Sequence, residues 1–295
     1  MATSKSPHEH AHAIADAVDA AWHRAHGYGH LEVPLSVVAA LAFLAPPVHE
    51  RDAVAAWVAD LSGDDLCRFV RTQWVLFVRT RPDLTNPVAP FALVWHGDQR
   101  LSEQALRGAR EVSRAAVRAG LFDLSGDTEA RRSVDLFGVL LTVMKGRNAQ
   151  SAHGAFYTPG HIADFLSYVG MSSQTEAPEI HEPTVGTGGM WRAAAEAMRE
   201  RGQDPAHATW VGIDIDPLAV ACAAVNTVLW QLGFRVVLGV GDSLTEEATT
   251  RALHQRDEAV RIAAEARTMR RMQAALDALT TPRSNTRPHS RKETQ

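Results

Sequence analysis

A glycine-rich turn and an acidic strand end are the two features of this chain whose residue types and spacing could do chemistry. Residues 179–190 read EIHEPTVGTGGM, which places Gly186, Gly188 and Gly189 between a strand-like segment and an alanine-rich segment typical of a helix. Glycines in such a turn allow a ligand to lie against bare backbone, near the first amides of a helix. Residues 209–216 read TWVGIDID, and an acid at the end of a second strand holds ribose hydroxyls in nucleotide-binding α/β folds. Together the two features predict a site for a nucleotide-like ligand.

Two other kinds of glycine loop fit these residues less well. A dinucleotide-binding loop needs the pattern G-x-G-x-x-G, whereas this chain has G-T-G-G. A phosphate-binding P-loop needs a lysine after the glycines, and Met190 and Trp191 follow here instead. For each residue taken singly, a plain turn or helix cap is the simpler alternative. That alternative loses weight because the glycines and the acids occur together.

Alternating strand-like and helix-like segments must position these residues. A helix-like segment over 191–201 is followed by a strand over 209–215, a helix over 217–232 and a strand over 236–240 that runs into Gly-Asp-Ser. Alternation of this kind specifies a parallel sheet with right-handed crossovers. The glycine turn and the acids are therefore expected at one edge of a small parallel sheet.

The first half of the chain reads as successive helices. Ile14, Val18 and Trp22 recur at four-residue spacing and share one helix face. Ser62 and Ser102 are suited to cap the helices that follow them. The predicted helices cover residues 8–26, 34–44, 52–61, 65–79, 102–119 and 133–144, and a turn-rich stretch is expected over 81–90. The inward-facing residues expected in the third helix are Val54, Trp57, Val58 and Leu61. This half is predicted to be a helical domain without a catalytic constellation.

One long helix is predicted over residues 245–279. Ile262, Met269 and Leu276 recur every seven residues in it, but only about two heptads are present, fewer than the ~3–4 that support a coiled coil. We therefore expect the helix to dock on its own domain, with pairing to a partner helix as the alternative. The remaining residues have the composition of a disordered tail. From Arg261 to the end of the sequence, Arg and Lys residues outnumber acidic residues, and this basic stretch could touch phosphates, although a solvated, disordered tail is the simpler interpretation.

Composition places the chain among ordinary globular proteins. Hydrophobic residues make up 45% and charged residues 22%, and a net charge of −4 gives no global nucleic-acid signature. No apolar run approaches the ~18 residues of a membrane span, and the start lacks the apolar region of a signal peptide, so a cytoplasmic location without a membrane partner is expected. Cys67 and Cys222 are expected to be small buried hydrophobes. The N-terminal histidines have no carboxylate or cysteine at a convincing ligand spacing, so no metal site is predicted.

Four short motifs occur in one order along the chain: GAFYTP, EPTVGTGGM, GIDIDP and GDSL. In this order they resemble the N-6 adenine DNA methyltransferases, in particular the modification subunits of type I restriction systems. The segment before the first motif is also similar to the family's D-x-x-G helix, through Asp135 and Gly138. The resemblance covers about residues 130–245 and implies a Rossmann-like domain that binds S-adenosylmethionine.

The resemblance and the chemistry of the side chains assign the same residues to this cofactor. Glu182 and the glycine amides would hold the methionine part, and Asp214 would accept hydrogen bonds from both ribose hydroxyls. Ile215 would lie beside the adenine, with Asp242 and Ser243 near its amino group, while FYTP would close over the methionine moiety. The residues assigned to the cofactor are Tyr157, Thr158, Pro159, Glu182, Pro183, Gly186, Thr187, Gly188, Gly189, Asp214, Ile215, Asp242 and Ser243.

The family's catalytic tetrapeptide, (N/D)-P-P-(Y/F), does not occur in this sequence, whose only Asn-Pro pair is Asn86-Pro87. In the family this motif follows the fourth strand and grips a flipped adenine. No catalytic residue is therefore predicted, and the resemblance implies a family member truncated after its third motif. Family strand order would be 3-2-1, which leaves the glycine-loop strand at an edge. An exposed edge is usually covered, and we expect the long C-terminal helix or another chain to cover it.

The predicted fold class is α/β: a helical N-terminal domain, an incomplete Rossmann-like sheet of three parallel strands and a long C-terminal helix. The expected divisions are a helical domain (1–150), an S-adenosylmethionine-binding half-domain (151–245), the long helix (246–279) and a disordered tail (280–295). The expected function is that of an N-6 adenine DNA methylase-like protein, incomplete by itself, with DNA implied as a partner. A protein partner or a second copy is expected at the sheet edge or the long helix. The alternative is a non-catalytic interaction or regulatory subunit that docks through its helical surfaces.

Overall fold

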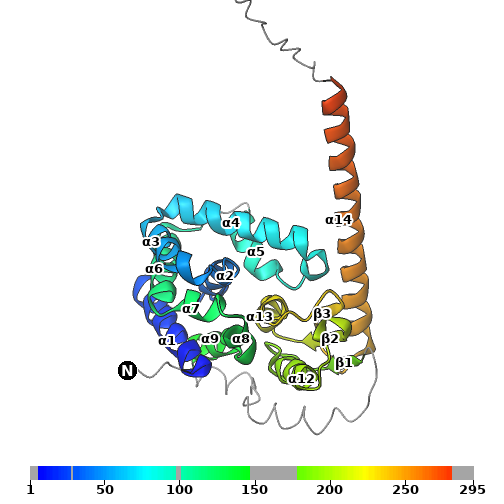
Figure 1. Cartoon of the computed structure of the whole chain (residues 1–295), viewed down its shortest axis with the longest axis horizontal. Coiled ribbons are helices and arrows are strands. Elements are labelled where there is room, and N and C mark those ends of the chain that lie inside the picture. The colour runs from blue at the N-terminus through cyan, green and yellow to red at the C-terminus, as the bar shows by residue number, and fades with distance from the viewer. Residues whose placement is uncertain (1–5, 28, 98–100, 147–177, 281–295) are drawn as a thin grey trace, which may run out of the picture.

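The computed structural model describes residues 6–27, 29–97, 101–146 and 178–280 (Figure 1). Helices make up the described part of the N-terminal half, as the sequence predicts. They are α1 (Pro7–Ala25), α2 (Glu32–Ala42), α3 (Arg51–Asp60), α4 (Gly63–Thr80), α5 (Ala89–His96), α6 (Glu103–Arg118), α7 (Leu121–Ser125), α8 (Thr128–Ser133) and α9 (Leu136–Lys145), with short 3₁₀ turns η1 (Val48–Glu50) and η2 (Pro82–Leu84).

Both predicted serine caps are confirmed. The hydroxyl of Ser62 accepts a hydrogen bond from the backbone N–H of Asp65 at 3.1 Å, and that of Ser102 accepts one from Ala105 at 3.1 Å. Each bond satisfies one of the N–H groups that the first turn of a helix leaves without an intrahelical partner. The chain therefore starts α4 and α6 where the sequence indicates.

Other features of the helical half differ in part from the predictions. The stretch predicted to be turn-rich, 81–90, has turns at 85–88, but it also contains η2 and the start of α5. The helices α7 and α8 were not predicted, because segments of five and six residues are too short to show an apolar period. Trp57 was expected to face inward, but it is 45% exposed and packs edge-on against Phe69, with ring centroids 5.3 Å apart.

A buried hydroxyl joins three helices of this half. Ser36 on α2 accepts hydrogen bonds from the indole Nε1 atoms of Trp74 on α4 and Trp95 on α5, at 2.7 and 2.8 Å. The same hydroxyl donates to the carbonyl of Phe91 at 3.0 Å. Because these polar groups satisfy one another, the large indole rings can lie in the core without the cost of an unpaired donor.

The predicted three-stranded parallel sheet is confirmed. Its elements are β1 (Glu179–Glu182), α12 (Gly189–Glu200), η3 (Pro205–His207), β2 (Thr209–Asp214), α13 (Pro217–Leu229) and β3 (Val236–Val240). The strand order is β1-β2-β3, with β1 parallel to β2 and β2 parallel to β3. Within the described residues β1 is an edge strand, as the family order implies, and its alternate residues are exposed.

The helix α13 lies between the sheet and the helical half (Figure 1). It packs against β2 and β3 on one side and against α2, α5 and α9 on the other. Buried side chains from both halves consequently form one continuous hydrophobic cluster. The predicted domain boundary near residue 150 falls outside the described residues, so the division into domains stays a prediction.

The long helix α14 (Glu246–Thr280) docks on the sheet through its first turns only. Ala248 and Ala252 are buried there against β2 and β3. Gly239 permits the close approach, since a Cβ at this position would lie 2.5 Å from the Cβ of Ala252. Beyond these turns α14 continues away from the sheet and past the ends of α4 and α5 (Figure 1).

Two expectations for α14 need correction. The helix docks on its own domain only in part: it contacts β3, β2 and η2, whereas Met269, Met272 and Leu276 in its last turns are 56–68% exposed. The helix also packs on β3 and β2 rather than covering the β1 edge. The short turn after β3 brings the chain straight back over β3, and this connection decides which part of the sheet α14 reaches.

No described helix is long and apolar enough to cross a membrane.

Candidate functional site

Three carboxylates end the three adjacent strands. Glu182 is the last residue of β1, Asp214 is the last residue of β2, and Asp242 follows β3. The register pairs Glu182 with Gly212 and Asp214 with Val240, so the strands end at the same edge of the sheet. In open α/β sheets, ligands bind outside the carboxyl ends of the strands.

The glycine loop between β1 and α12 is fastened to β2 at this edge. The backbone N–H of Gly186 donates to Asp214 Oδ2 at 2.8 Å, and the N–H of Val185 donates to the carbonyl of Ile213 at 3.0 Å. Gly186 and Gly188 have φ angles of 54° and 92°, a left-handed conformation that favours glycine. Gly188 is the residue from which α12 starts, so the loop delivers the first amides of a helix to the site.

The carboxylates of Asp214 and Glu182 each organise the backbone near them. Asp214 Oδ1 accepts a hydrogen bond from the N–H of Asp216 at 2.9 Å, in addition to the Gly186 contact at the other oxygen. Glu182 Oε1 accepts hydrogen bonds from the N–H and the hydroxyl of Thr184, both at 3.3 Å. Pro183, which lies between Glu182 and Thr184 in the sequence, is exposed. Because each carboxylate oxygen can accept more than one hydrogen bond, both acids keep acceptor capacity for a ligand.

An exposed apolar side chain stands among these acids. Ile215 directly follows β2 and is 76% exposed. Asp242 is exposed after β3, where its Oδ1 accepts a hydrogen bond from the N–H of Leu244 at 3.0 Å, and Ser243 is half-buried. An apolar surface next to hydrogen-bonding groups suits a flat heterocycle. The other predicted site residues, Tyr157, Thr158 and Pro159, lie outside the described residues.

The helical half contributes a carboxylate that was not assigned to the site from the sequence. Asp135, at the start of α9, accepts a hydrogen bond at Oδ2 from the hydroxyl of Thr187 in the glycine loop, at 2.6 Å. Protein atoms surround this carboxylate, although part of the residue is accessible, and burial raises its pKa above 3.8. Hydrogen bonds from Thr187, Gly138 and Asn226 partly offset the effect of burial on the pKa.

A second contact between the halves joins Lys145 to Asp216. The Nζ atom of Lys145, at the end of α9, forms an ion pair with Asp216 Oδ2. Asp216 also caps α13, since its Oδ1 accepts a hydrogen bond from the N–H of Leu218 at 3.0 Å. The sequence offered the D-x-x-G pattern as a signal for Asp135. It offered no comparable signal for the partnership of Lys145 and Asp216, which are 71 residues apart.

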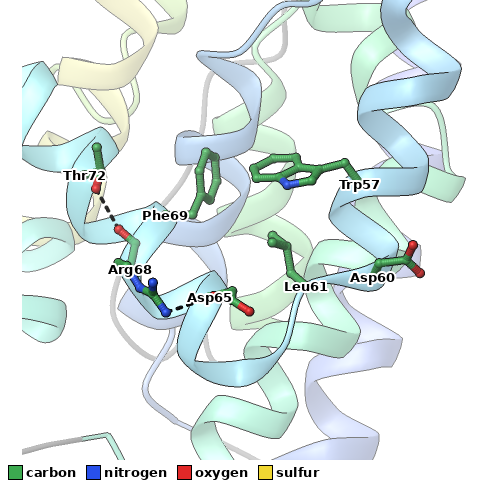
Figure 2. A pocket seen from close by; sticks show the side chains of 7 residues that line it. All are labelled: Trp57, Asp60, Leu61, Asp65, Arg68, Phe69 and Thr72. Carbon is green, nitrogen blue, oxygen red and sulfur yellow. Dashed lines mark hydrogen bonds and ion pairs between the residues drawn. The ribbon is translucent and has the colours of Figure 1, made fainter.

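A hollow elsewhere on the molecule is unrelated to this edge. It has a volume of about 520 Å³ and lies between α3 and α4 (Figure 2). Its lining residues are Trp57, Asp60, Leu61, Asp65, Arg68, Phe69 and Thr72. Figure 2 shows the Asp65–Arg68 ion pair at its rim, which is an ordinary pair within one helix. Among the described residues, no group of three or more His, Cys, Asp or Glu side chains is placed to hold a metal ion.

Residues 133–264 match the family model described as N-6 DNA Methylase. This segment is therefore similar to the N-6 DNA methylase family. The matched segment begins just before Asp135, contains the glycine loop and all three strand-end acids, and ends within α14. The matched segment therefore includes both α9 of the helical half and the sheet. These are the elements that the contacts of Asp135 and Lys145 hold together. The helices before residue 133 lie outside the matched segment.

Proposed function

We propose that this chain binds S-adenosylmethionine at the carboxyl edge of its sheet and serves the family's reaction, methyl transfer to the N6 atom of adenine in DNA. The observation that carries the proposal is the hydrogen bond from the N–H of Gly186 to Asp214 Oδ2. This contact holds the glycine loop after β1 against the acidic residue that ends β2. Both residues lie in the segment that matches the N-6 DNA methylase model, and this match favours S-adenosylmethionine as the ligand. The residues present fit the cofactor in charge, polarity and order.

Each part of the cofactor has a chemically suitable partner at this edge. In the proposed complex, Glu182 faces the ammonium group of the methionine part, and the first amides of α12 face its carboxylate. Asp214 accepts hydrogen bonds from the ribose hydroxyls with the lone pairs left free by Gly186 and Asp216. Ile215 lies against the adenine ring.

The bound cofactor supplies an electrophilic methyl group. This chain's own residues orient the cofactor, and we assign none of them to the target base, because the (N/D)-P-P-(Y/F) tetrapeptide does not occur in the sequence. We propose that residues outside this sequence supply the grip on the base, as part of a cytoplasmic restriction-modification assembly similar to type I systems. The β1 edge and the exposed half of α14 are the surfaces available for a partner in such an assembly.

Isothermal titration calorimetry with S-adenosylmethionine tests the binding. The chain is expected to bind, and Asp214→Ala is expected to weaken binding at least about tenfold, because a hydrogen bond to a charged group contributes about 1.5–3 kcal/mol. Asp204→Ala is the matched control. Asp204 also accepts a hydrogen bond from the backbone N–H of the residue two positions later. It precedes β2, however, and so lies near the amino ends of the strands, opposite the candidate site. Absence of binding by the wild-type chain, or equal affinities for it and Asp214→Ala, would refute the proposal.

A tritium methyl-transfer assay on DNA tests the need for a partner. Turnover is expected only after a polypeptide carrying the base-gripping tetrapeptide is added. Sustained turnover by the isolated chain would show that it grips the base by other means.

A non-catalytic interaction subunit is the second candidate, and the exposed apolar residues of α14 favour it. Met269 and Leu276 are 68% and 56% exposed at heptad spacing. Light scattering of the wild-type chain and of a Met269→Ser/Leu276→Ser variant tests this candidate. An oligomer that the variant abolishes supports it, whereas a strict monomer that binds the cofactor argues against it.

A further inference from the structure

Asp135 makes more contacts than a helix cap requires. It caps α9, because its Oδ1 accepts a hydrogen bond from the N–H of Gly138 at 2.7 Å. Its Oδ2 accepts the hydroxyl of Thr187, a residue of the glycine loop 52 positions later. By contrast Asp127, the cap of α8, is exposed, and within the described residues its carboxylate accepts a hydrogen bond only from the N–H of Ala130, at 2.9 Å.

A third element, the helix α13, completes the same network. The amide Nδ2 of Asn226 on α13 donates to Asp135 Oδ1 at 2.7 Å and to the carbonyl of Thr187 at 2.8 Å. Thr187 is thus held by its side chain from α9 and by its backbone from α13. It is 3% exposed, so its hydroxyl lies inside the protein, whereas Gly186 and Gly189 in the same loop are partly exposed.

Two glycines leave room for these contacts. A Cβ at Gly138 would lie 2.2 Å from Asp135 Oδ2 and 2.8 Å from the hydroxyl oxygen of Thr187. A Cβ at Gly188 would lie 3.0 Å from the ring of Trp230, whose Nε1 donates to the carbonyl of Val134, the residue before Asp135. The start of α9 and the glycine loop therefore meet through a fitted set of small residues and hydrogen bonds.

We propose that Asp135 is a positioning residue for the S-adenosylmethionine site: it acts through Thr187 to hold the glycine loop in its binding conformation. This inference rests on the proposed function. It makes the helical half a part of the cofactor site, because α9 supplies the support beneath the loop. A loop that is already ordered loses less conformational freedom on binding, and this favours affinity.

A double-mutant cycle read out as cofactor affinity tests the proposal. Asp135→Ser keeps a capping oxygen but is too short to reach Thr187, and Thr187→Val keeps the side-chain shape but removes the hydroxyl. Each single variant is expected to weaken S-adenosylmethionine binding about tenfold, the effect of one lost hydrogen bond at the upper end of the usual range. The double variant is expected to bind no more weakly than the weaker single variant, because both remove the same contact. Asp127→Ser is the matched control for loss of an acidic cap and is expected to leave affinity unchanged.

Hydrogen exchange of the amides of residues 184–189, measured well below the unfolding temperature of every variant, separates positioning from general stability. Asp135→Ser and Thr187→Val are expected to speed exchange in this loop, whereas Asp127→Ser is not. If the wild-type chain binds the cofactor and both variants bind equally well, the positioning role is refuted and the proposed function stands. If the wild-type chain does not bind, both are refuted. If Asp135→Ser fails to fold, the affinity of Thr187→Val decides.

Discussion

Gly188 is a glycine-loop position where an added side chain meets little room. Its φ of 92° is left-handed, and an L-residue there costs about 1–2 kcal/mol. A Cβ would also lie 3.0 Å from Cζ3 of Trp230, whose side chain is fully buried and fixed by its hydrogen bond to the carbonyl of Val134. Overpacking of this kind destabilises a protein by about 1–3 kcal/mol. Replacing glycine by alanine also lowers the conformational entropy of the unfolded chain, which stabilises the folded state by about 0.4–1 kcal/mol. Gly188→Ala is therefore expected to lower the free energy of unfolding by about 1–4.5 kcal/mol.

Gly202→Ala is the matched control for this variant. Gly202 has a φ of 72°, but it is exposed and a Cβ there would have no neighbour within 4 Å. The control therefore carries the backbone strain without the contact with an indole ring, and its expected cost is about 0–1.5 kcal/mol. The difference between the two variants isolates the packing of the glycine loop on Trp230.

Urea unfolding followed by circular dichroism measures both variants against the wild-type chain. A change in the unfolding midpoint at constant slope reports a change in stability. If Gly188→Ala is destabilised no more than Gly202→Ala, Trp230 does not limit the space at the loop. The description of the loop as a fitted contact would then be wrong.

Three further outcomes follow from the contacts of the described residues. Arg81→Ala is expected to cost about 3–5 kcal/mol in urea unfolding, because it leaves the buried carboxylate of Asp83 without its guanidinium partner; a loss below about 1 kcal/mol would contradict this. Ala252→Leu should cost about 1–3 kcal/mol by overpacking α14 on the sheet, whereas Met272→Ser on the exposed half should change stability by less than about 0.5 kcal/mol, and similar values would contradict the partial docking of α14. Burial raises the pKa of Asp135 above 3.8, so the folded state binds more protons than the unfolded state between 3.8 and the folded pKa, and this carboxyl makes stability fall as pH rises through that window. Relative to Asp135→Asn, the wild-type chain should therefore gain stability when unfolding is measured at about pH 4.5 instead of about pH 7, and an unchanged difference would refute this.

The sequence by itself determined the local elements and the order of the site residues. Ser62 and Ser102 mark helix starts because a capping hydroxyl acts on amides three residues away. The alternation of strands and helices after residue 179 predicts the parallel sheet, since a crossover helix between strands leaves few other arrangements. The glycine loop and Asp214 were recognisable because each is marked by a short local pattern: closely spaced glycines in a turn, and an acidic residue at the end of a strand-like segment.

Only the tertiary structure decided which of these elements touch. The contact between Asp135 and Thr187 joins a helix to a loop across 52 residues, and periodicity carries no information over such a separation. The sequence also did not predict the exposure of Trp57 and of the far half of α14. An apolar helix face can be recognised in the sequence, but whether another surface packs against it depends on the tertiary structure. The chain bends back over β3 after Asp242, so α14 covers the far strand and leaves β1 at the edge. The residue types at the glycine loop were thus encoded locally, while its support from α9 and α13 depends on how the two halves pack.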